Sequence, residues 1–428
     1  MPNIRIPYAK TFVEVDVPVE NLRGVLESKA HHFKAEKSEE ELVKKAMMSP
    51  VGSSRLKNMA DGKQNIVIIT SDHTRPVPSK ITMPILLEEI RSGNPEASIT
   101  ILIATGFHRA TTEEELLNRF GERIYHNEKI VVHDCQNEDE LTYMGKLPSG
   151  GDLTLNRRAV EADLLISEGF IEPHFFAGFS GGRKSVLPGI AGHKTVLANH
   201  CAEFIASPNA RTGVLKDNPM HKDMLYAAEK ANLSCILNVV INSEKEIIEA
   251  FAGHPVEAHE KGCRLVEEMA MVKPVPADIL ITSNGGYPLD QNIYQTVKGM
   301  TAAEASAKPG AVIIIVSACN DGHGGESFYK TFLEAKSPGE VMESILGREM
   351  ESTLPDQWES QILARILMKH EIILVTDQCD ENLITNMHMK HAASLDEALK
   401  MAFSMKGKNA GVTVIPDGVG VIVKLEEL

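Results

Sequence analysis

Short β-branched hydrophobic runs alternate with amphipathic segments along most of the chain. The runs predict strands at Asn65–Thr70, Ser98–Ala104, Lys129–Val132, Asp163–Ser167, Ser234–Ile241, Asp278–Thr282, Gly310–Val316 and Glu371–Thr376. The amphipathic segments predict helices at Ser79–Ser92, Thr112–Phe120, Lys194–Ala206, Pro255–Val272, Phe328–Ala335, Asp356–Met368 and Ser394–Ser404. Strands that alternate with helices are typical of βαβ units and parallel sheets. The predicted fold class is therefore α/β.

The length of the chain predicts two domains, because a single hydrophobic core stops growing well before 428 residues. The sequence Val272-Lys273-Pro274-Val275-Pro276 should be extended, since the residue before a proline avoids the α region. We place the boundary there, with an N-terminal α/β domain at 1–272 and a C-terminal α/β domain at 273–428. We expect largely parallel sheets and an active-site crevice between the domains. Whether the last strand, Gly411–Lys424, returns to the first domain stays open.

Composition and charge exclude several classes of protein. With 43% hydrophobic and 24% charged residues, the chain reads as an ordinary globular protein. A formal charge of -15 and the lack of a basic patch argue against nucleic-acid partners. The six cysteines form no C-x-x-C pair and read as reduced thiols. No signal peptide or membrane-spanning stretch is visible, so we expect a cytoplasmic protein without a membrane partner.

The densest candidate site is the glycine-rich segment from Glu172 to Ser185, which follows a predicted strand. Its glycines allow backbone N–H groups to approach an anion, and Lys184 supplies either a charge or a nucleophilic amine. A nucleotide-binding P-loop would need glycine where Arg183 stands, which disfavours a phosphate-binding, kinase-like enzyme. In isolation, this segment could also be a tight connection with a solvated lysine.

Further candidate residues lie in loops that follow other strands. Ser71–Pro78 and Thr105–Thr112 should share a sheet edge with the glycine-rich segment, which would gather His108, His174, Arg75 and Lys184. His193 and His200 flank a short helical pattern seven residues apart, and either could bind a metal. Each residue also has an ordinary role available as a cap, a turn former or a packed side chain.

The second half of the chain offers a smaller cluster. Tyr294, Gln295 and Lys298 fall at helical spacing, and an amide beside an ammonium could hold a carboxylate. Trp358, the only tryptophan, suits either the core or a pocket wall. We expect His323 to be a loop residue rather than a catalytic residue.

Five separated segments together resemble the nickel-dependent lactate racemase family. They are Asp72-His73-Thr74-Arg75-Pro76, Gly106-Phe107-His108-Arg109, Glu172-Pro173-His174, Gly181-Gly182-Arg183-Lys184-Ser185 and His200. The match runs through both predicted domains, and the agreement in order and spacing makes it specific.

The resemblance implies a cofactor and a role for each matching residue. The cofactor would be nickel held in pyridinium-3-thioamide-5-thiocarboxylic acid mononucleotide, the nickel pincer nucleotide, which biosynthesis proteins would supply. Lys184 matches the tethering lysine, His200 the nickel ligand, and His108 and His174 the acid/base pair. The other implied roles are contacts to the cofactor by Asp72, His73, Thr74, Gly178 and Ser180, and contacts to substrate by Arg75, Tyr294, Gln295, Lys298 and Trp358.

The implied reaction is racemisation of D- and L-lactate by reversible hydride transfer to the cofactor. One histidine would take the hydroxyl proton of one enantiomer, and the other would do the same for its mirror image. The main alternative is a racemase or epimerase of another 2-hydroxy acid. A kinase-like enzyme or a sensor that binds a hydroxy acid without turnover is less favoured.

Overall fold

The computed structural model describes residues 3–424, apart from the side chain of His32. The chain divides into two compact units. The N-unit comprises Ala30–Asn199 and Pro208–Met269. The C-unit comprises the segment that ends at Lys29, the segment His200–Ser207, and the chain from Ala270 onward. The units therefore interleave along the sequence, and a division into folding domains at residue 272 stays a proposal.

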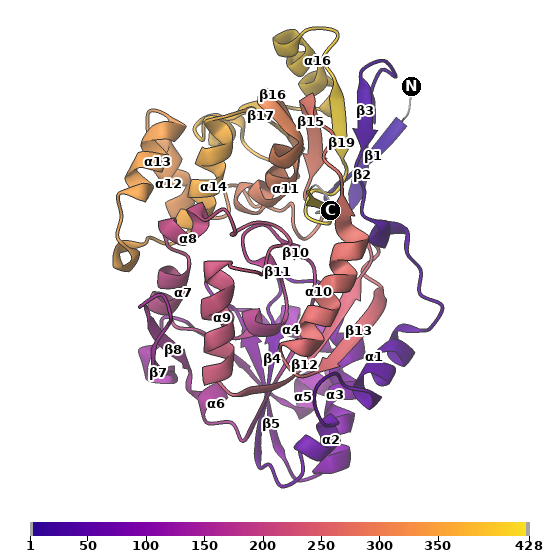
Figure 1. The fold of residues 1–428 in the computed structure, drawn as a ribbon, viewed down its shortest axis with the longest axis vertical. Helices are drawn as coiled ribbons and strands as arrows, with labels where there is room; N and C mark the ends of the chain where they lie inside the picture. The colour runs from indigo at the N-terminus through magenta and orange to yellow at the C-terminus, as the bar shows by residue number, and fades with distance from the viewer. Residues whose placement is uncertain (1–2, 425–428) are drawn as a thin grey trace. The chain divides into compact units, whose positions relative to one another are not determined.

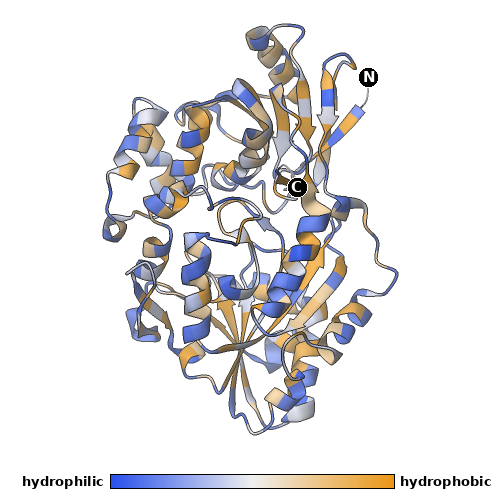
Figure 2. Cartoon of the chain, viewed as in Figure 1, coloured by the Kyte–Doolittle hydropathy of each residue, from blue (hydrophilic) through white to orange (hydrophobic). Residues whose placement is uncertain are grey.

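The N-unit is built on a six-stranded sheet in the order β13-β12-β9-β4-β5-β6 (Figure 1). All neighbours are parallel except β12 and β13. The strands are β4 (Asn65–Ser71), β5 (Ser98–Ala104), β6 (Lys129–Val132), β9 (Leu164–Phe170), β12 (Leu233–Ile241) and β13 (Ile247–Gly253). The central residues of β4, β5 and β9 are buried in unbroken runs because helices cover parallel sheets on both faces. Figure 2 shows these strands as mainly hydrophobic and α9 and α10 as rich in hydrophilic positions.

Short helices and two small hairpins complete the N-unit. The helices are α1 (Glu39–Met48), α2 (Leu56–Met59), α3 (Ser79–Gly93), α4 (Glu113–Phe120), α5 (Glu122–Asn127), α6 (Arg157–Val160), α7 (His193–Asn199), α9 (Pro219–Lys230), α10 (Glu257–Ala270) and the 3-10 turns η1 (Lys29–His32), η2 (Glu138–Glu140) and η3 (Gly182–Ser185). The hairpins pair β7 (Leu141–Lys146) with β8 (Asp152–Asn156) and β10 (Pro173–His174) with β11 (Gly178–Phe179). Capping boxes fix where α1 and α4 begin, with Ser38 and Thr112 as the caps.

The C-unit has its own six-stranded sheet, in the order β18-β17-β16-β15-β19-β3, with every neighbouring pair parallel. Its strands are β3 (Leu22–Val25), β15 (Ala277–Ser283), β16 (Ala307–Val316), β17 (Glu371–Val375), β18 (Lys390–Ala392) and β19 (Val412–Ile415). The end of the chain stays in this unit: β19 pairs with β15, and β20 (Ile422–Val423) pairs with β14 (Met271–Val272). The start of the chain joins it through β3 and the hairpin of β1 (Asn3–Tyr8) and β2 (Thr11–Asp16).

The helices of the C-unit include two that carry candidate residues. They are α8 (Ala202–Ala206), α11 (Ile293–Ser306), α12 (Glu326–Leu333), α13 (Pro338–Leu346), α14 (Gln357–Leu367), α15 (Glu381–Thr385), α16 (Leu395–Lys406) and the 3-10 turn η4 (Met350–Ser352). Helix α11 packs against β15 and β16 and also contacts α14. No helix between residues 3 and 424 combines the length and the apolar character that crossing a membrane requires. The predicted α/β class with largely parallel sheets is confirmed.

One predicted helix is wrong. The segment Lys194–Ala206 is two helices, α7 and α8, separated at His200 and Cys201. Cys201 has extended backbone angles and caps α8, which prevents a continuous helix. His200 consequently lies in a turn outside α7, so helical periodicity does not place it on a common face with His193.

A carboxylate inside the N-unit ties the start of α3 to the sheet. Glu168 on β9 is 0% exposed and accepts hydrogen bonds from the hydroxyls of Thr70 at 2.5 Å, Ser79 at 2.9 Å and Thr82. Thr70 belongs to β4, whereas Ser79 and Thr82 lie in the first turn of α3. The carboxylate therefore holds the loop between β4 and α3 at both of its ends.

We predict that Glu168→Ala lowers the free energy of unfolding of the apoprotein by about 3 kcal/mol, because three buried hydroxyls lose a charged acceptor. Urea denaturation measures this change. The matched control is Glu244→Ala, whose side chain is exposed and whose loss should change stability by less than about 0.5 kcal/mol. Equal midpoints for the two variants would contradict the anchoring role of Glu168.

Candidate active site

The candidate residues of the N-unit lie on loops at one edge of its sheet. Strands β9, β4 and β5 are neighbours and parallel, so the loops that follow them begin side by side. In open α/β sheets, ligands bind at this carboxyl edge. Two of the loops also touch: the Gly106 N–H donates to the Gly189 carbonyl at 3.0 Å, and Gly106 has φ of 54°.

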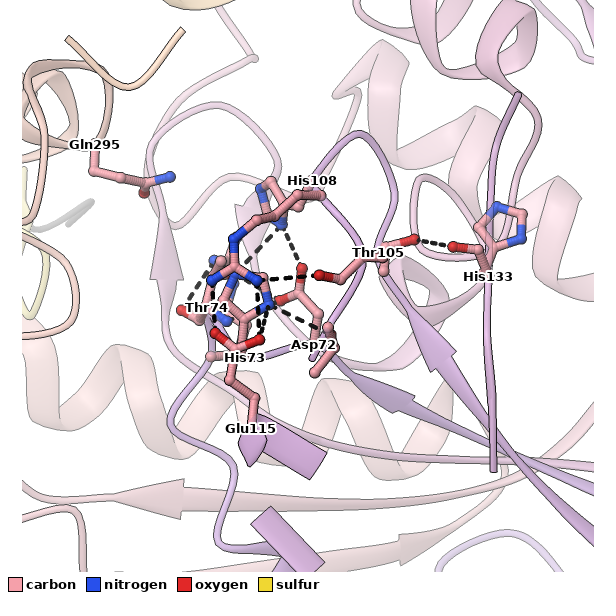
Figure 3. A network of polar contacts seen from close by, with 12 residues as sticks. Asp72, His73, Thr74, Thr105, His108, Glu115, His133 and Gln295 are labelled. Atoms are coloured by element: carbon pink, nitrogen blue, oxygen red, sulfur yellow. Dashed lines mark hydrogen bonds and ion pairs between the residues drawn. The ribbon is translucent and has the colours of Figure 1, made fainter. Parts of the chain in front are cut away.

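Asp72 and His108 form the best-defined polar pair at this edge (Figure 3). The carboxylate of Asp72 is 2% exposed, and its Oδ2 lies 2.6 Å from His108 Nδ1. Its Oδ1 accepts from the Thr74 N–H at 3.1 Å and the Thr74 hydroxyl at 2.6 Å, which closes an Asx-turn. Burial alone would raise the pKa of Asp72, but His108, Arg75 and Thr74 outweigh it and hold that pKa far below its usual range.

An ionised carboxylate can only accept hydrogen bonds, so Asp72 fixes the tautomer of His108. Nδ1 carries the proton, and in the neutral ring the lone pair is on Nε2. The ring is half-buried, with 33% of its side chain exposed. The Asp72 carboxylate thus orients the imidazole of His108 and leaves the Nε2 lone pair of the neutral ring available to accept a proton.

Two arginines shape the loop that follows β4. Arg75 Nη1 donates to the Thr74 hydroxyl at 2.8 Å, which places this guanidinium beside the Asp72 and His108 pair. Arg119 on α4 donates to the carbonyl of Asp72 and, at 2.7 Å, to that of Arg75. Burial lowers the pKa of Arg119 from its ordinary value, although nearby carboxylates oppose the shift.

His73 turns toward a different set of groups from its neighbour Asp72. Its Nδ1 lies 3.3 Å from the Thr111 hydroxyl and 3.8 Å from a carboxylate oxygen of Glu115. Burial is the largest effect on the ring and lowers its pKa. Glu115 in turn binds Arg109, and that hydrogen bond lowers the pKa of Glu115 to about 2.

The second cluster joins His174 to Lys184. His174 Nδ1 accepts from the Ala177 N–H at 3.2 Å, and its Nε2 lies 3.3 Å from Lys184 Nζ. The ammonium position of Lys184 is also 5.7 Å from the centre of the Phe176 ring. Because an amide N–H can only donate, Nδ1 of His174 holds the lone pair, and the neutral ring carries its proton on Nε2. The tautomer of His174 is therefore opposite to that of His108.

The loop between these two residues is organised from inside by Arg183, which is 1% exposed. Its guanidinium donates to the carbonyls of Ala177 at 2.8 Å and Phe179 at 2.9 Å, and to His221 Nδ1 at 2.9 Å. Burial lowers the pKa of Arg183 to about 10. Burial, and then the charge of Arg183, lower the pKa of His221 to about 3, so this ring is a neutral acceptor.

The glycines and Ser180 of this loop are packed against protein. Gly182 donates its N–H to Asn238 Oδ1 at 2.8 Å, and a Cβ at Gly181 would stand 2.7 Å from the same oxygen. Gly178 has φ of 79°, and a Cβ there would meet the Val214 carbonyl oxygen at 2.4 Å. The Ser180 hydroxyl accepts from the Glu172 N–H and donates to the Phe170 carbonyl. Cofactor contacts by Gly178 and Ser180 stay predictions.

In the C-unit, the remaining candidate residues form two sets of contacts. Trp358 Nε1 donates to the Tyr294 hydroxyl at 2.7 Å, and its ring lies 4.8 Å from that of His200. The His200 side chain is buried, with the residue 4% exposed. Lys298 Nζ donates to Gln295 Oε1, so the amide and the ammonium act on the same side of α11.

The candidate metal residues are distributed between the two units. His193 begins α7 in the N-unit, where its ring lies 5.0 Å from that of Phe107, whereas His200 belongs to the C-unit. Within residues 3–424, no cluster of three or more His, Cys, Asp or Glu side chains is arranged to hold a metal ion. His200 as a ligand therefore stays a prediction.

Sequence reasoning missed the residues whose hydrogen bonds hold the loops of the candidate site in place. Arg183 stands in a segment that carries the family resemblance and departs from the P-loop, but the sequence assigned it no role, and Arg119, His221 and Asn238 were not among the candidate residues. Arg119 binds the carbonyl of Asp72, Asn238 accepts from the N–H of Gly182, and His221 accepts from the side chain of Arg183; each of these partners is far away in sequence, so spacing carries no signal for them. The sequence offered one hint to a supporting residue: Arg183 stands inside a glycine-rich loop, in a chain whose formal charge is -15.

Comparisons with known proteins identify the family to which the chain belongs. Residues 8–213 match the lactate racemase N-terminal domain, and residues 272–423 match the lactate racemase C-terminal domain. The chain is 59% identical to a lactate racemase of Thermoanaerobacterium thermosaccharolyticum and 54% identical to one of Lactiplantibacillus plantarum, each over 99% of this chain and 100% of the relative.

Solved structures extend the comparison to the fold. The lactate racemase apoprotein from Thermoanaerobacterium thermosaccharolyticum superimposes with a TM-score of 0.95 at 59% identity, over 99% of this chain and 100% of that one. A Thermotoga maritima protein of 19% identity shares the fold, with a TM-score of 0.66 over 90% of this chain and 97% of its own. The chain belongs to the lactate racemase family and is an isomerase.

Proposed function

We propose that this enzyme interconverts D- and L-lactate. The observation that carries the proposal is the pair of imidazoles at one sheet edge, His108 held by Asp72 and His174 beside Lys184, in a member of this family. The direct experiment supplies pure L- or D-lactate to protein made with the cofactor-biosynthesis proteins and follows the other enantiomer by chiral chromatography. Stronger activity on a larger 2-hydroxy acid would favour the main alternative, a racemase or epimerase of that acid.

The residues present fit a nickel pincer nucleotide tethered to Lys184. The Lys184 amine stands 3.3 Å from His174 Nε2, and a lysine amine can be acylated to form a covalent linkage. His200 supplies a buried imidazole, a ligand type that suits nickel. When bound, the group would supply a reversible acceptor for hydride. We propose Asp72, His73, Thr74, Gly178 and Ser180 as its remaining contacts.

The chain's own residues would bind the substrate and move its hydroxyl proton. Arg75 in the N-unit and Gln295 and Lys298 in the C-unit carry donors that a carboxylate can accept from, and we propose them as substrate contacts, as the family resemblance implies. We propose the same for Tyr294 and Trp358, which are joined by a hydrogen bond. His108 Nε2 takes the hydroxyl proton, and the Asp72 carboxylate stabilises the imidazolium that results. His174 completes the acid/base pair. We also propose a cytoplasmic location and maturation by the cofactor-biosynthesis proteins.

We predict that intact mass spectrometry of the matured protein shows the mass of the cofactor on the wild type and not on Lys184→Ala, because the alanine variant lacks the amine. The matched control is Lys194→Ala, which removes a lysine whose side chain is 82% exposed and should leave the added mass in place. An equal added mass on the Lys184→Ala variant would place the tether elsewhere.

We predict that Asp72→Asn lowers racemisation by about 100- to 10,000-fold, because an amide that donates to His108 Nδ1 moves the ring proton to Nε2. Chiral analysis of the initial rate measures the loss. Asp163→Asn is the matched control: its carboxylate also accepts backbone N–H groups, at the opposite end of the same sheet. Similar rates for the two variants would show that His108 does not depend on Asp72.

A further inference from the structure

The partly exposed side of α11 carries three of the candidate substrate residues. Tyr294, Gln295 and Lys298 are partly exposed in the first two turns of this helix, whereas the two positions between Gln295 and Lys298 are buried. The polar ends of Gln295 and Lys298 are joined to each other, so Tyr294 supplies the large apolar surface next to them. The room for a ligand beside these two polar groups therefore depends on how firmly the Tyr294 ring is held.

Phe328 on α12 packs against the Tyr294 ring from the interior of the C-unit. The two ring centres are 5.4 Å apart and the ring planes are nearly perpendicular, at 83°, the edge-to-face geometry that aromatic pairs prefer. Phe328 is 0% exposed and also contacts Phe332, likewise 0% exposed, at 5.7 Å between ring centres. Because protein interiors are close-packed, the Tyr294 ring cannot move toward Phe328 without displacing core side chains.

Two hydrogen bonds hold the remaining parts of Tyr294. Trp358 Nε1 donates to its hydroxyl at 2.7 Å, and its backbone N–H donates to the His323 carbonyl at 3.2 Å. His323 lies in the segment that leads from β16 into α12, the helix that carries Phe328. One continuous segment of the chain thus holds both the backbone and the ring of Tyr294.

We propose that Phe328 is a positioning residue that determines the size of the substrate. By fixing the Tyr294 ring together with Trp358, it keeps the space beside Gln295 and Lys298 suited to the methyl group of lactate and too small for a longer alkyl chain. The inference rests on the proposed substrate contact of Tyr294 and adds the residue that makes this contact rigid. Phe328 acts through Tyr294 and does not need to touch the substrate.

The test compares racemisation of lactate and of 2-hydroxybutanoate, which has an ethyl group in place of the methyl, by the enzyme loaded with its cofactor. One methylene against a fixed wall changes kcat/KM by about 10- to 200-fold. Phe328→Ala lets the Tyr294 ring move back, so the ratio of kcat/KM for 2-hydroxybutanoate to that for lactate should rise at least about tenfold, mainly through a lower KM for 2-hydroxybutanoate. Phe328→Leu keeps most of the bulk and should raise this ratio less.

Phe332→Ala is the matched control. Phe332 lies one turn further along α12, is equally buried, and contacts Phe328 and His388 rather than Tyr294. Its loss should lower stability about as much as the loss of Phe328, because both changes leave a cavity of the same kind in the core. The substrate ratio of Phe332→Ala should stay close to that of the wild type.

A second measurement reads the same contact in the apoprotein, without turnover. Trp358 is the only tryptophan of the chain, so its fluorescence reports on the hydrogen bond to Tyr294. Tyr294→Phe removes the hydroxyl and gives the reference spectrum for the broken bond. The emission of Phe328→Ala should shift in the same direction as that of Tyr294→Phe, and the emission of Phe332→Ala should stay at the wild-type position.

The outcomes separate this inference from the proposed function. An unchanged ratio in Phe328→Ala, an equal change in Phe332→Ala, or wild-type emission from Phe328→Ala would overturn the role of Phe328. If Phe328→Ala does not fold, the ratio and the emission of Phe328→Leu decide in the same way. A wild type that prefers 2-hydroxybutanoate would contradict lactate as the substrate, while the change of the ratio in the variants would still test Phe328.

Discussion

A carboxylate buried at the end of β4 decides how the imidazole above it can act. Asp72 is 2% exposed and stays ionised because His108, Arg75 and Thr74 compensate for its lost hydration. An ionised acceptor on Nδ1 leaves His108 one arrangement in its neutral form, with a lone pair on Nε2. Arg119 holds the backbone carbonyl of the same aspartate, so the loop and the charge are fixed together. In the proposed mechanism, the role of His108 as a base depends on that anchored charge.

The glycine-rich loop shows a second use of a buried charge. Arg183 points into the protein and organises three carbonyls of its own loop, while its neighbour Lys184 is half-buried beside His174. The acceptors of Arg183 are carbonyls and a neutral imidazole, which stabilise a cation less well than a carboxylate would. The benefit is local: positions 177–181 are held in one conformation, with left-handed backbone at Gly178 and Gly181. The loop thus presents His174 and Lys184 on a rigid base.

The sequence predicted strands and helices correctly where a continuous hydrophobic or amphipathic run forms a single strand or helix. The bounds of the buried strand β5 and of the edge strand β6 were predicted to the residue, because unbroken β-branched runs bounded by polar residues have few alternatives. The edge strand β3 was missed. Its four residues form a strand because they pair with β19, a partner far away in the sequence. The helix across His200 was predicted wrongly because periodicity does not register a break that a cap at Cys201 imposes.

The candidate site was predictable in part for a similar reason. Parallel strands bring their following loops to one edge, and this placed His108, His174 and Lys184 on neighbouring loops from the sequence alone. The proton on each ring was not predictable, because it depends on whether a distant carboxylate or a nearby amide meets Nδ1. The family resemblance supplied roles for both histidines and left their opposite tautomers unstated.

The central claim is that the histidines handle only the hydroxyl proton, while the α-hydrogen travels as hydride. Racemisation of lactate deuterated at its α-carbon, in ordinary water, tests this most directly when the deuterium content of both enantiomers is measured by mass spectrometry. The account predicts that the deuterium is retained in the newly formed enantiomer. Loss of deuterium to solvent at the rate of racemisation would contradict it, because an imidazole would then be removing the α-hydrogen as a proton.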